Sequence, residues 1–431
     1  MNMLAHRLAL RNLLRHRRRS GFTAAIIVST MALLTCFLGL SDGGHQAMIQ
    51  VGVRMGLGHL ILSQQGHAQD PSLERLIAKG PQALEQSRAA AGTLASSVVP
   101  RLRFSAMAQA GAQQIAVTAS GVEPALELPV SGIADARAII VGYPLPVPTA
   151  QASPGEAPAR TGLPPLVLGE RLAKALDVRI GDRVTLTVKP LGGGEFARAA
   201  FELHGIFRTG IQELDAFWVE LPLEAAQQLT GAAQGVSQLA LYLEDEQQLP
   251  ALQLQMQPLL EARAWEAQAW TQAAPELNSA VAMDAAGMAL LMVIVIVVVV
   301  AGILNTVIMS VLKRHREFGV MLALGSSPGL IVRVVLLESL YLAGTSLLLG
   351  LLLGLAAHWH FATEGLNFRE VFGTGLEAGG VLLPERFYSL LKPLKLAGVA
   401  TLILLLTLLV SLYPAYKSGR LKPIEAIKHH A

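Results

Sequence analysis

Four long apolar stretches constrain this chain more than any other feature. Crossing a hydrocarbon core of about 30 Å takes about 20 helical residues. Stretches that approach or exceed this length lie at residues 21–40, 287–312, 334–357 and 396–412. The chain is 52% hydrophobic and only 15% charged, which is unusual for a soluble protein. The sequence therefore predicts an integral membrane protein with four transmembrane helices.

Basic residues next to these stretches predict how the chain is oriented. They precede the first stretch (Arg7, Arg11, Arg15, Arg17, Arg18, Arg19), follow the second (Lys313, Arg314, Arg316) and follow the fourth (Lys417, Arg420, Lys422, Lys428). Cytoplasmic loops carry an excess of Lys and Arg. Both termini are therefore expected in the cytoplasm, with residues 42–284 and 358–393 on the external side. The net charge of +3 is too small to favour a nucleic-acid partner.

This orientation divides the chain into nine segments. We expect a basic amphipathic cytoplasmic helix (1–20), transmembrane helix 1 (21–41), an external α+β domain (42–284), transmembrane helix 2 (285–312), a cytoplasmic helix (313–329), transmembrane helix 3 (330–357), an external loop (358–393), transmembrane helix 4 (394–413) and a cytoplasmic tail (414–431). For residues 1–20, a simple topogenic cluster of arginines is the alternative to an amphipathic helix.

The external segment has the texture of a globular α+β domain. Alternating runs predict strands at residues 59–65, 113–124 and 183–188, with a helix at 169–176. The Gln- and Ala-rich stretch 244–270 is expected to be helical. Between these elements, residues 142–165 are rich in Pro, Ala and Gly, which is typical of an exposed linker. The domain is therefore expected to have two lobes.

Within the spans, small residues and one acid carry information about packing. The acid is Glu338, whose burial requires a partner, and Arg333 or a lipid headgroup is favoured over a substrate or proton role. Rows of small residues at four-residue spacing let helix backbones approach closely. These rows are Gly302, Thr306 and Ser310 in the second span, and Ser346, Gly350 and Gly354 in the third.

A short charged and apolar segment separates the second span from the third. Its basic and acidic residues come first, its apolar residues follow, and Gly325 and Pro328 are placed to end a helix. A short helix with an apolar face and fixed charges is suited to docking into a groove of a partner protein. We therefore expect this helix to contact a cytoplasmic ATPase.

Motifs for catalysis and for cofactor binding are missing from the sequence. It contains no G-x-x-x-x-G-K-[ST] loop for ATP phosphates and no G-x-S-x-G elbow. The His358–His360 and His429–His430 pairs lack the Cys or acidic neighbours of a zinc site. We therefore expect no enzyme activity, no catalytic residue, no metal site and no cofactor in this chain. ATP and Mg²⁺ would bind to a separate ATPase subunit.

Two motifs and the order of elements resemble a known family. The segment 314–327 fits the pattern R-x-R-E-[IF]-G-x-x-x-A-x-G-[AS]-[ST], and the stretch "YPAYKSGRLKPIEAIKH" fits a P-A-x-x-[AS]-x-x-x-x-P-x-x-A-[IL] tail. Together with the four spans, these resemble the MacB/FtsX-type permeases of ABC transporters. Within that family, "LGERLAKALDVRIGDRVTL" and "GIFRTGIQELDAFWVELPLEAAQQL" resemble the lipoprotein-releasing permeases LolC and LolE.

The resemblance implies a location, partners and a function. The chain would lie in a bacterial inner membrane with its large domain in the periplasm, beside a second permease chain, identical or related, and two ATPase subunits. Its function would be extraction or release of lipoproteins or other amphiphiles. The alternatives are FtsX-like mechanotransmission to a periplasmic partner, and MacB-like efflux of peptides or small molecules through an adaptor and an outer-membrane duct. The residues implied in coupling to the ATPase are Arg314, Arg316, Glu317, Phe318, Gly319, Met321, Leu322 and Gly325.

A lipid-anchored substrate suggests a second set of residues. Acyl chains could enter between the outer halves of the first and second spans, where flexible Met and Leu side chains suit varied chains. The residues expected there are Leu33, Phe37, Leu40, Met288 and Met292. Plain helix packing is the alternative explanation for these side chains.

Overall fold

The computed structural model describes most of the chain and divides it into two compact units. The described residues are 2–15, 17–135, 137–147, 162–367, 370, 377–378, 381–382 and 386–419. The first unit comprises Met1–Gln46, Ala282–Thr374 and Glu385–Ala431, and the second comprises Ala47–Val281 and Gly375–Pro384.

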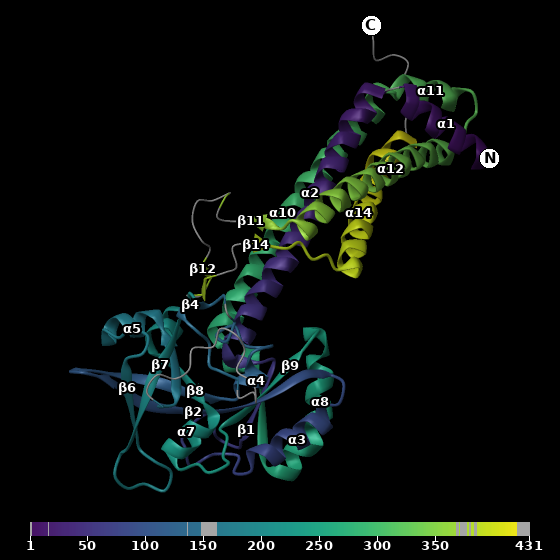
Figure 1. The fold of residues 1–431 in the computed structure, drawn as a ribbon. Coiled ribbons are helices and arrows are strands. Elements are labelled where there is room, and N and C mark those ends of the chain that lie inside the picture. Colours follow the sequence, from purple (N-terminus) through teal and green to yellow (C-terminus); the bar gives the residue numbers. More distant parts are fainter. Residues whose placement is uncertain are drawn as a thin grey trace. The chain divides into compact units, whose positions relative to one another are not determined.

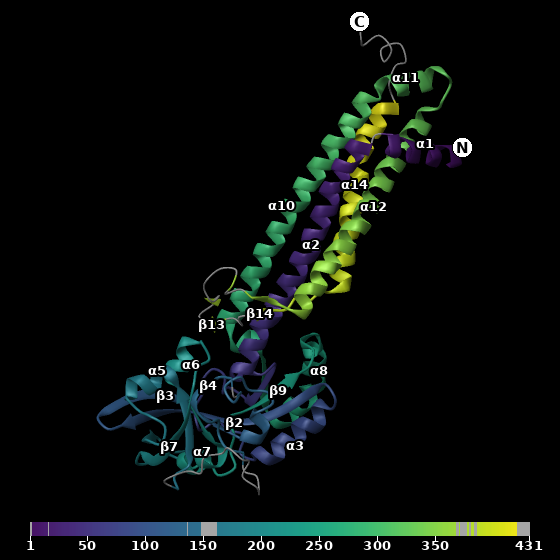
Figure 2. The same ribbon diagram turned by 45° about the horizontal axis from the view of Figure 1, so that its top comes forward.

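Long helices form the first unit (Figures 1 and 2). They are α1 (Asn2–Arg15), α2 (Arg17–Gly52), α10 (Pro275–Lys313), α11 (His315–Ala323), α12 (Pro328–Thr363) and α14 (Pro393–Gly419). Within the described ranges, four helices are long and apolar enough to cross a membrane, and they contain Ser20–Leu57, Pro275–Lys313, Pro328–Thr363 and Pro393–Ser418. The predicted four-span helical membrane protein is thus confirmed.

Close packing of α2 against α12 supports the bundle. A Cβ atom at Gly350 would lie 2.7 Å from both the Val28 carbonyl oxygen and the Met31 Cβ. One at Gly354 would lie 2.5 Å from the Thr35 Cβ. A side chain at either α12 position would therefore overlap atoms of α2, from the backbone and the Met31 side chain at Gly350 and from the Thr35 side chain at Gly354. The small-residue row of the third span is therefore a packing surface, as its spacing predicted.

The helices run beyond the apolar stretches from which the spans were predicted. α2 continues to Gly52, α10 already begins at Pro275, and α12 continues to Thr363, into the predicted external loop 358–393. The basic segment predicted as a helix over 1–20 is α1, which ends at Arg15. Hydropathy detects only the residues that suit hydrocarbon, whereas backbone hydrogen bonding can continue a helix into a polar environment.

The segment that precedes α14 is fastened to the bundle. The Leu390 amide donates to the Gly39 carbonyl oxygen at 2.8 Å, and a Cβ at Gly43 would overlap the Tyr388 carbonyl. The side chains of His358 and Ser389 are 2.7 Å apart. Two short antiparallel strand pairs precede this segment. In the first, β11 (Leu366–Asn367) pairs with β14 (Arg386–Phe387), and in the second, β12 (Glu377–Ala378) pairs with β13 (Val381–Leu382).

A mixed sheet of ten described strands forms the centre of the second unit. Its strands are β1 (Leu60–Gln64), β2 (Ala95–Ala110), β3 (Gln113–Val122), β4 (Ile139–Gly142), β5 (Pro165–Gly169), β6 (Arg183–Val188), β7 (Ala197–Phe207), β8 (Trp218–Pro222), β9 (Gln238–Leu243) and β10 (Trp265–Ala269). The order is β10-β1-β9-β2-β3-β8-β5-β7-β4, and β6 pairs with β2 and β7. The β3–β8 and β5–β7 pairs are parallel, and the other pairs are antiparallel.

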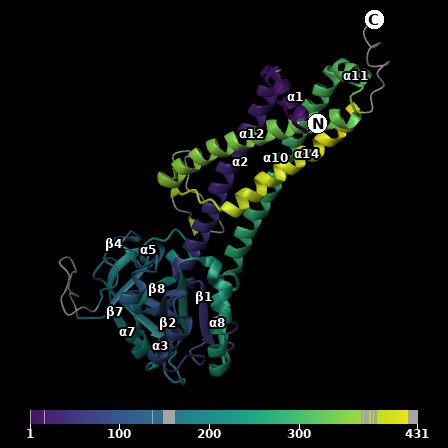
Figure 3. The same cartoon turned by 90° about the vertical axis from the view of Figure 1, so that its right-hand side faces the viewer.

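Short helices cover this sheet. They are α3 (Gly80–Ala91), α4 (Pro124–Glu127), α5 (Glu170–Leu176), α6 (Gln212–Phe217), α7 (Leu223–Thr230), α8 (Leu249–Arg263) and α9 (Trp270–Ala273), with the turns η1 (Val53–Leu57) and η2 (Glu246–Gln248). α3 and α8 pack on each other (Figure 3). One apolar cluster includes Leu102, Leu168 and Phe201, and another includes Leu62, Val99 and Leu241. Because β2 contributes to both clusters, the division into two lobes stays a prediction.

Local sequence patterns predicted some of these elements and misplaced one. β6 has the predicted bounds, and α5 matches the predicted helix except for its first residue. The helix predicted over 244–270 is wrong in its last part, because residues Trp265–Ala269 form β10. There, Leu60 pairs with Ala269 across β1 and β10, so pairing with a distant strand overrides local helix propensity. Residues 148–161 of the predicted linker lie outside the described residues.

Candidate functional site

The segment between the second and third spans folds into a short helix with defined ends. α10 ends at Lys313, Arg314 leaves helical geometry, and α11 then runs from His315 to Ala323. Beyond it, the Ser326 amide donates to Met321 and the Gly325 amide to Leu322, the pattern of a Schellman motif. Gly325 has φ +87°, a conformation that favours glycine. The predicted role of Gly325 in ending the helix is confirmed.

Arg314 joins this short helix to the third span. Its side chain is only 8% exposed, and its Nη1 lies 2.6 Å from Glu338 Oε2 on α12. Its Nε lies 3.2 Å from Glu317 Oε2, and its guanidinium carbon lies 4.8 Å from the centre of the Phe318 ring. The partner of Glu338 is therefore Arg314 rather than the predicted Arg333. Arg314 was expected on the docking surface, but it lies beneath it.

One face of α11 packs into the chain. Phe318 is 1% exposed within the apolar bundle core, and Gly319 is also buried. Leu322 is half-buried against the same core. Met321 packs on that core too and on a cluster that contains Ala5 of α1 and Leu330 of α12. This face holds α11 in place.

The opposite face of α11 is exposed. Arg316, Glu317 and Gly325 are accessible among the residues expected to contact the ATPase. Val320 and Leu324 lie on the same face, and Leu324 is 81% exposed. Arg316, Val320 and Leu324 follow one another at four-residue spacing, which places them on one stripe of the helix. We call Arg316, Glu317, Val320 and Leu324 the α11 stripe. Val320 and Leu324 are not among the residues from which coupling was expected, although their four-residue spacing from Arg316 places them on the same stripe.

The N-terminal helix α1 lies against the third span. His6 Nδ1 and the Tyr341 hydroxyl are 2.6 Å apart. Ala5 and Ala9 are buried in the chain, whereas Arg7, Arg11 and Arg15 are exposed. α1 thus exposes these arginines and buries these alanines. Leu10 of the same helix is 50% exposed.

The residues expected near an acyl chain differ in accessibility. Leu33 on α2 is 70% exposed, while Phe37, Leu40 and Met288 are half-buried. Met292 is half-buried against the bundle core. Further along both helices, His45 Nε2 of α2 lies 2.6 Å from Asp284 Oδ2 of α10. Of this set, Leu33 is the side chain most open to a ligand or to lipid.

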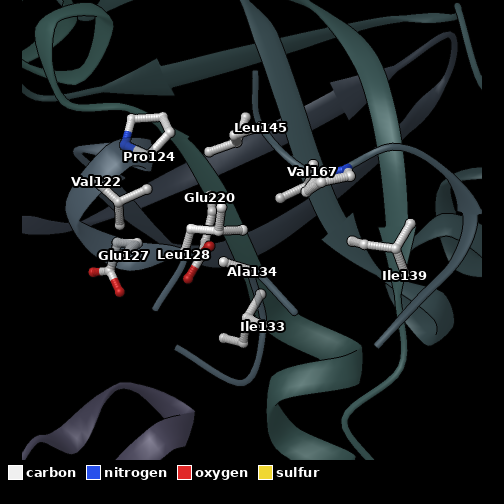
Figure 4. Close-up of a pocket in the computed structure, with 11 residues that line it drawn as sticks. Val122, Pro124, Glu127, Leu128, Ile133, Ala134, Ile139, Leu145, Val167 and Glu220 are labelled. Atoms are coloured by element: carbon white, nitrogen blue, oxygen red, sulfur yellow. The ribbon is translucent and has the colours of Figure 1, made fainter. Parts of the chain in front are cut away.

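A cluster of buried charged and polar side chains lies in the second unit. Its residues were not predicted as a site from the sequence. Arg101 of β2 donates to both oxygens of Glu127, and its Nη2 lies 2.6 Å from the Tyr242 hydroxyl. Glu220 lines a small cavity of about 10 Å³ with Glu127 and with apolar side chains (Figure 4), room for about one water. The signal was available in "VVPRLRF", because arginines inside an apolar strand need buried partners.

Burial changes the proton affinity of Glu220. Loss of hydration and the nearby Glu127 carboxylate raise its pKa to about 7, against the favourable charges of Arg101 and Arg103. The Trp218 indole Nε1 donates to the Glu220 carboxylate at 3.3 Å. This buried acid therefore changes charge near neutral pH.

A second carboxylate explains one of the sequence motifs. Asp215 is buried and accepts hydrogen bonds from the Thr209 amide, the Thr209 hydroxyl and the Gly210 amide, at 2.7, 2.9 and 3.1 Å. The "TGIQELD" segment is thus closed by its own side chain and is structural. In the part of the chain that the structure describes, no group of three His, Cys, Asp or Glu side chains is arranged to hold a metal ion.

Comparison with known proteins identifies relatives of the chain. Residues 289–423 match the family "FtsX-like permease C-terminal". The chain is 23% identical over 269 residues to the lipoprotein-releasing system transmembrane protein LolC of Neisseria meningitidis, covering 61% of this chain and 65% of that protein. It is 28% identical over 270 residues to LolE of Haemophilus influenzae, covering 62% and 64%. The matched part therefore spans just under two thirds of each relative.

Two solved external domains also match. The periplasmic region of MacB from Actinobacillus actinomycetemcomitans is 12% identical with a TM-score of 0.35, covering 51% of this chain and 92% of that one. The extracellular domain of YknZ, from Gram-positive bacteria, is 12% identical with a TM-score of 0.32, covering 49% and 98%. The family match, the curated relatives and the four spans thus make this chain similar to FtsX-like permeases, with LolC and LolE among its relatives.

Proposed function

We propose that this chain couples ATP hydrolysis by a separate ATPase subunit to the extraction or release of lipoproteins or other amphiphiles from a bacterial inner membrane. Two copies of the ATPase would bind on the cytoplasmic side, where both termini of this chain would lie. A second permease chain, identical or related, would complete the transporter. The large domain would work in the periplasm.

The arrangement of α11 carries the proposal. The α11 stripe is exposed, while Arg314 and Phe318 fix the helix to the bundle from beneath. A docking surface transmits force only if it cannot move independently of the spans that it drives. The 2.6 Å contact of Arg314 with Glu338 supplies such a connection to α12. An ATPase that pushes on the stripe would therefore move the third span as well.

Two further observations support the substrate and the second permease chain. The relatives named above are components of lipoprotein-releasing systems. In the most apolar part of α10 only 11% of residues are buried, against 39% in the most apolar part of the first span. Exposed side chains such as Val293 and Val297 leave α10 open to lipid and to a second permease chain. Helix association in membranes depends on this kind of direct packing.

Charge reversal on the stripe tests the coupling. In the purified complex, Glu317→Lys should reduce ATPase binding or stimulation by tenfold or more, because it reverses a docking charge and places a cation beside Arg314. Glu261→Lys, an exposed reversal on α8, is the control and should behave like the wild type. A Glu317→Lys complex with normal ATPase affinity and full ATP-driven activity would refute the coupling role of α11.

Photo-crosslinking tests the substrate. A crosslinking amino acid at the exposed Leu33 should capture acylated peptides on irradiation, and ATP added before irradiation should prevent these adducts from forming. The same amino acid at Leu34, which is 3% exposed, is the control and should capture α10 or α12. If Leu33 yields no acylated adduct while the periplasmic domain retains a soluble hydrolase, the function is mechanotransmission. Retention of an adaptor protein would indicate efflux.

A further inference from the structure

A charged side chain is buried in the middle of the sheet of the second unit. Arg101 is 2% exposed, and its backbone pairs with Val122 of β3 and Gln238 of β9. Its guanidinium donates to Glu127, to Tyr242 and to the carbonyl oxygen of Gly56. Burying such an ion pair rarely stabilises a fold more than apolar side chains would. The arrangement therefore calls for a reason other than stability.

The Gly56 carbonyl belongs to the turn that directly continues α2. η1 (Val53–Leu57) follows Gly52, the last residue of α2. The Gly56 oxygen also accepts a hydrogen bond from Arg103 Nη2 at 2.5 Å. Two neighbouring arginines of β2 thus hold one carbonyl oxygen at the end of α2. A lysine could not make the same set of bonds, because it lacks the planar fork of an arginine.

Other contacts complete this attachment. The Gly132 amide donates to the Arg54 carbonyl at 2.8 Å, and a Cβ at Gly132 would lie 2.8 Å from the Met55 Cε. Met55 packs on the apolar cluster that contains Ile133 and Trp218. The turn is therefore held from β2 on one side and from the segment after α4 on the other. We call η1 with Arg101, Arg103 and Glu127 the α2 joint.

Close to the α2 joint, the first residues of α10 contact the last residues of α2. A Cβ at Gly52 would lie 2.1 Å from Leu277 Cδ2, so the two helices are in direct contact there. Beyond them, β1 and β10 are hydrogen-bonded neighbours, with Leu60 opposite Ala269. The Trp270 amide donates to the His59 carbonyl at 3.1 Å. Both helices thus connect to adjacent strands of one sheet.

We propose that Arg101 is a positioning residue that fixes the end of α2 to the sheet, so that movement of the helix is passed to the external domain without being lost in a flexible linker. The inference rests on the proposed function, since it assigns the element through which coupling reaches this domain. Glu127 would hold the Arg101 guanidinium through both of its carboxylate oxygens, and the Tyr242 hydroxyl would orient Arg101 Nη2.

Distance measurements test the joint without any ATPase. Spin labels at Gln50 of α2 and Gln109 of β2, both exposed, would report on the full chain in nanodiscs by double electron–electron resonance. Arg101→Lys, Glu127→Gln and Tyr242→Phe should each broaden the distance distribution, at least twofold for Arg101→Lys. Asp215→Asn is the matched control, because it removes another buried carboxylate with several hydrogen bonds. It should leave the width unchanged.

A second measurement separates a positioning role from a merely structural one. In the complex with the ATPase, Glu127→Gln should hydrolyse ATP at the wild-type rate but release the acylated substrate at least fivefold more slowly, measured as the decline of the Leu33 adduct when irradiation follows ATP at increasing delays. Asp215→Asn should release the substrate normally. Unchanged distance widths in all three joint variants, or broadened widths with normal release, would overturn the inference. If the wild type shows no decline of the adduct after ATP, the proposed function fails, and the width measurement still decides whether the joint is rigid.

Discussion

Arg314 and Glu338 form an ion pair of 2.6 Å that connects the segment after the second span to the third span. Their side chains are 8% and 16% exposed, so both charges are largely removed from water. The two residues are 24 positions apart in the chain. Arg314 immediately precedes α11 and Glu338 lies on α12, so the ion pair connects the start of α11 to α12. Its consequence is that α11 has little freedom to move without α12.

Removing one member of this pair should be costly. Glu338→Leu leaves the Arg314 charge with only Glu317, and breaking a buried pair typically costs about 3–5 kcal/mol. The double variant Arg314→Met with Glu338→Leu should recover at least half of the loss, because no uncompensated charge remains. Thermal unfolding of the wild type, Glu338→Leu, Arg314→Met and the double variant in detergent gives the coupling energy. If the two single losses simply added up in the double variant, the pair would not be energetically linked.

Two glycines of α12 should respond differently to alanine. Gly350→Ala should destabilise the bundle by about 1–3 kcal/mol, since the new methyl group meets the α2 backbone at 2.7 Å. Gly344 has no atom within 4 Å of the same position. There, alanine should be neutral or stabilise by up to about 1 kcal/mol, because it restricts the unfolded chain. The midpoint of thermal unfolding distinguishes the two, and equal shifts would contradict the packing of α2 on α12.

The end of α11 should be sensitive to backbone conformation alone. Gly325 has φ +87° and open space beside it, so Gly325→Ala is strained but does not clash. It should cost about 1 kcal/mol and weaken ATPase stimulation by loosening the α11 stripe. Gly325→Asn should retain more function, because asparagine tolerates this conformation better. ATPase stimulation curves for both variants provide the measurement. An alanine variant more active than the asparagine variant would contradict the explanation.

Local stability around β8 should fall as pH rises. Glutamate has an ordinary pKa of 4.5, and in the folded domain that of Glu220 is raised to about 7. Below the ordinary value both states bind the proton, so burial then carries no ionisation cost. The cost develops between pH 4.5 and 7 and is fully present above pH 7, reaching about 3 kcal/mol. Amide hydrogen exchange in β8 should therefore show less protection at pH 8 than at pH 5, after correction for the intrinsic rate.

Two variants control the pH experiment. Glu220→Gln should abolish the difference between pH 5 and pH 8. Glu170→Gln should not change it, because hydrogen bonds from Arg208 and Lys174 lower the pKa of Glu170 to about 2, so the stability that its ionised form contributes is lost only as pH falls from 4.5 towards 2. A pH dependence that persists in Glu220→Gln would show that another group is responsible.

The sequence was most informative where structure depends on neighbouring residues. A run of apolar residues is enough to predict a span, and Gly325 was enough to predict the end of α11. The close approach at Gly350 also followed from spacing alone. Each of these is a local property, since helix length, helix ends and the faces of a helix depend on positions a few residues apart.

Partners that are far apart in the chain could not be predicted. Glu338 has Arg333 one helical turn away, yet it pairs with Arg314, because the fold brings α11 against α12. The partners of Arg101 could not be predicted either, because one of them is the carbonyl oxygen of Gly56, in a turn that is far from Arg101 in the chain. The strand at residues 265–269 likewise depends on β1, some 200 residues earlier. In each case tertiary contact decides between local alternatives that the sequence leaves open.

The adjacency of β1 and β10 has a consequence for how such chains diversify. The chain enters the sheet of the second unit at Leu60 and leaves it at Ala269, and these two residues face each other across one ladder. A domain whose entry and exit are neighbours can be removed or exchanged without stretching the chain on either side. The helices of the first unit could thus keep their own packing while the domain between α2 and α10 changes in size or sequence.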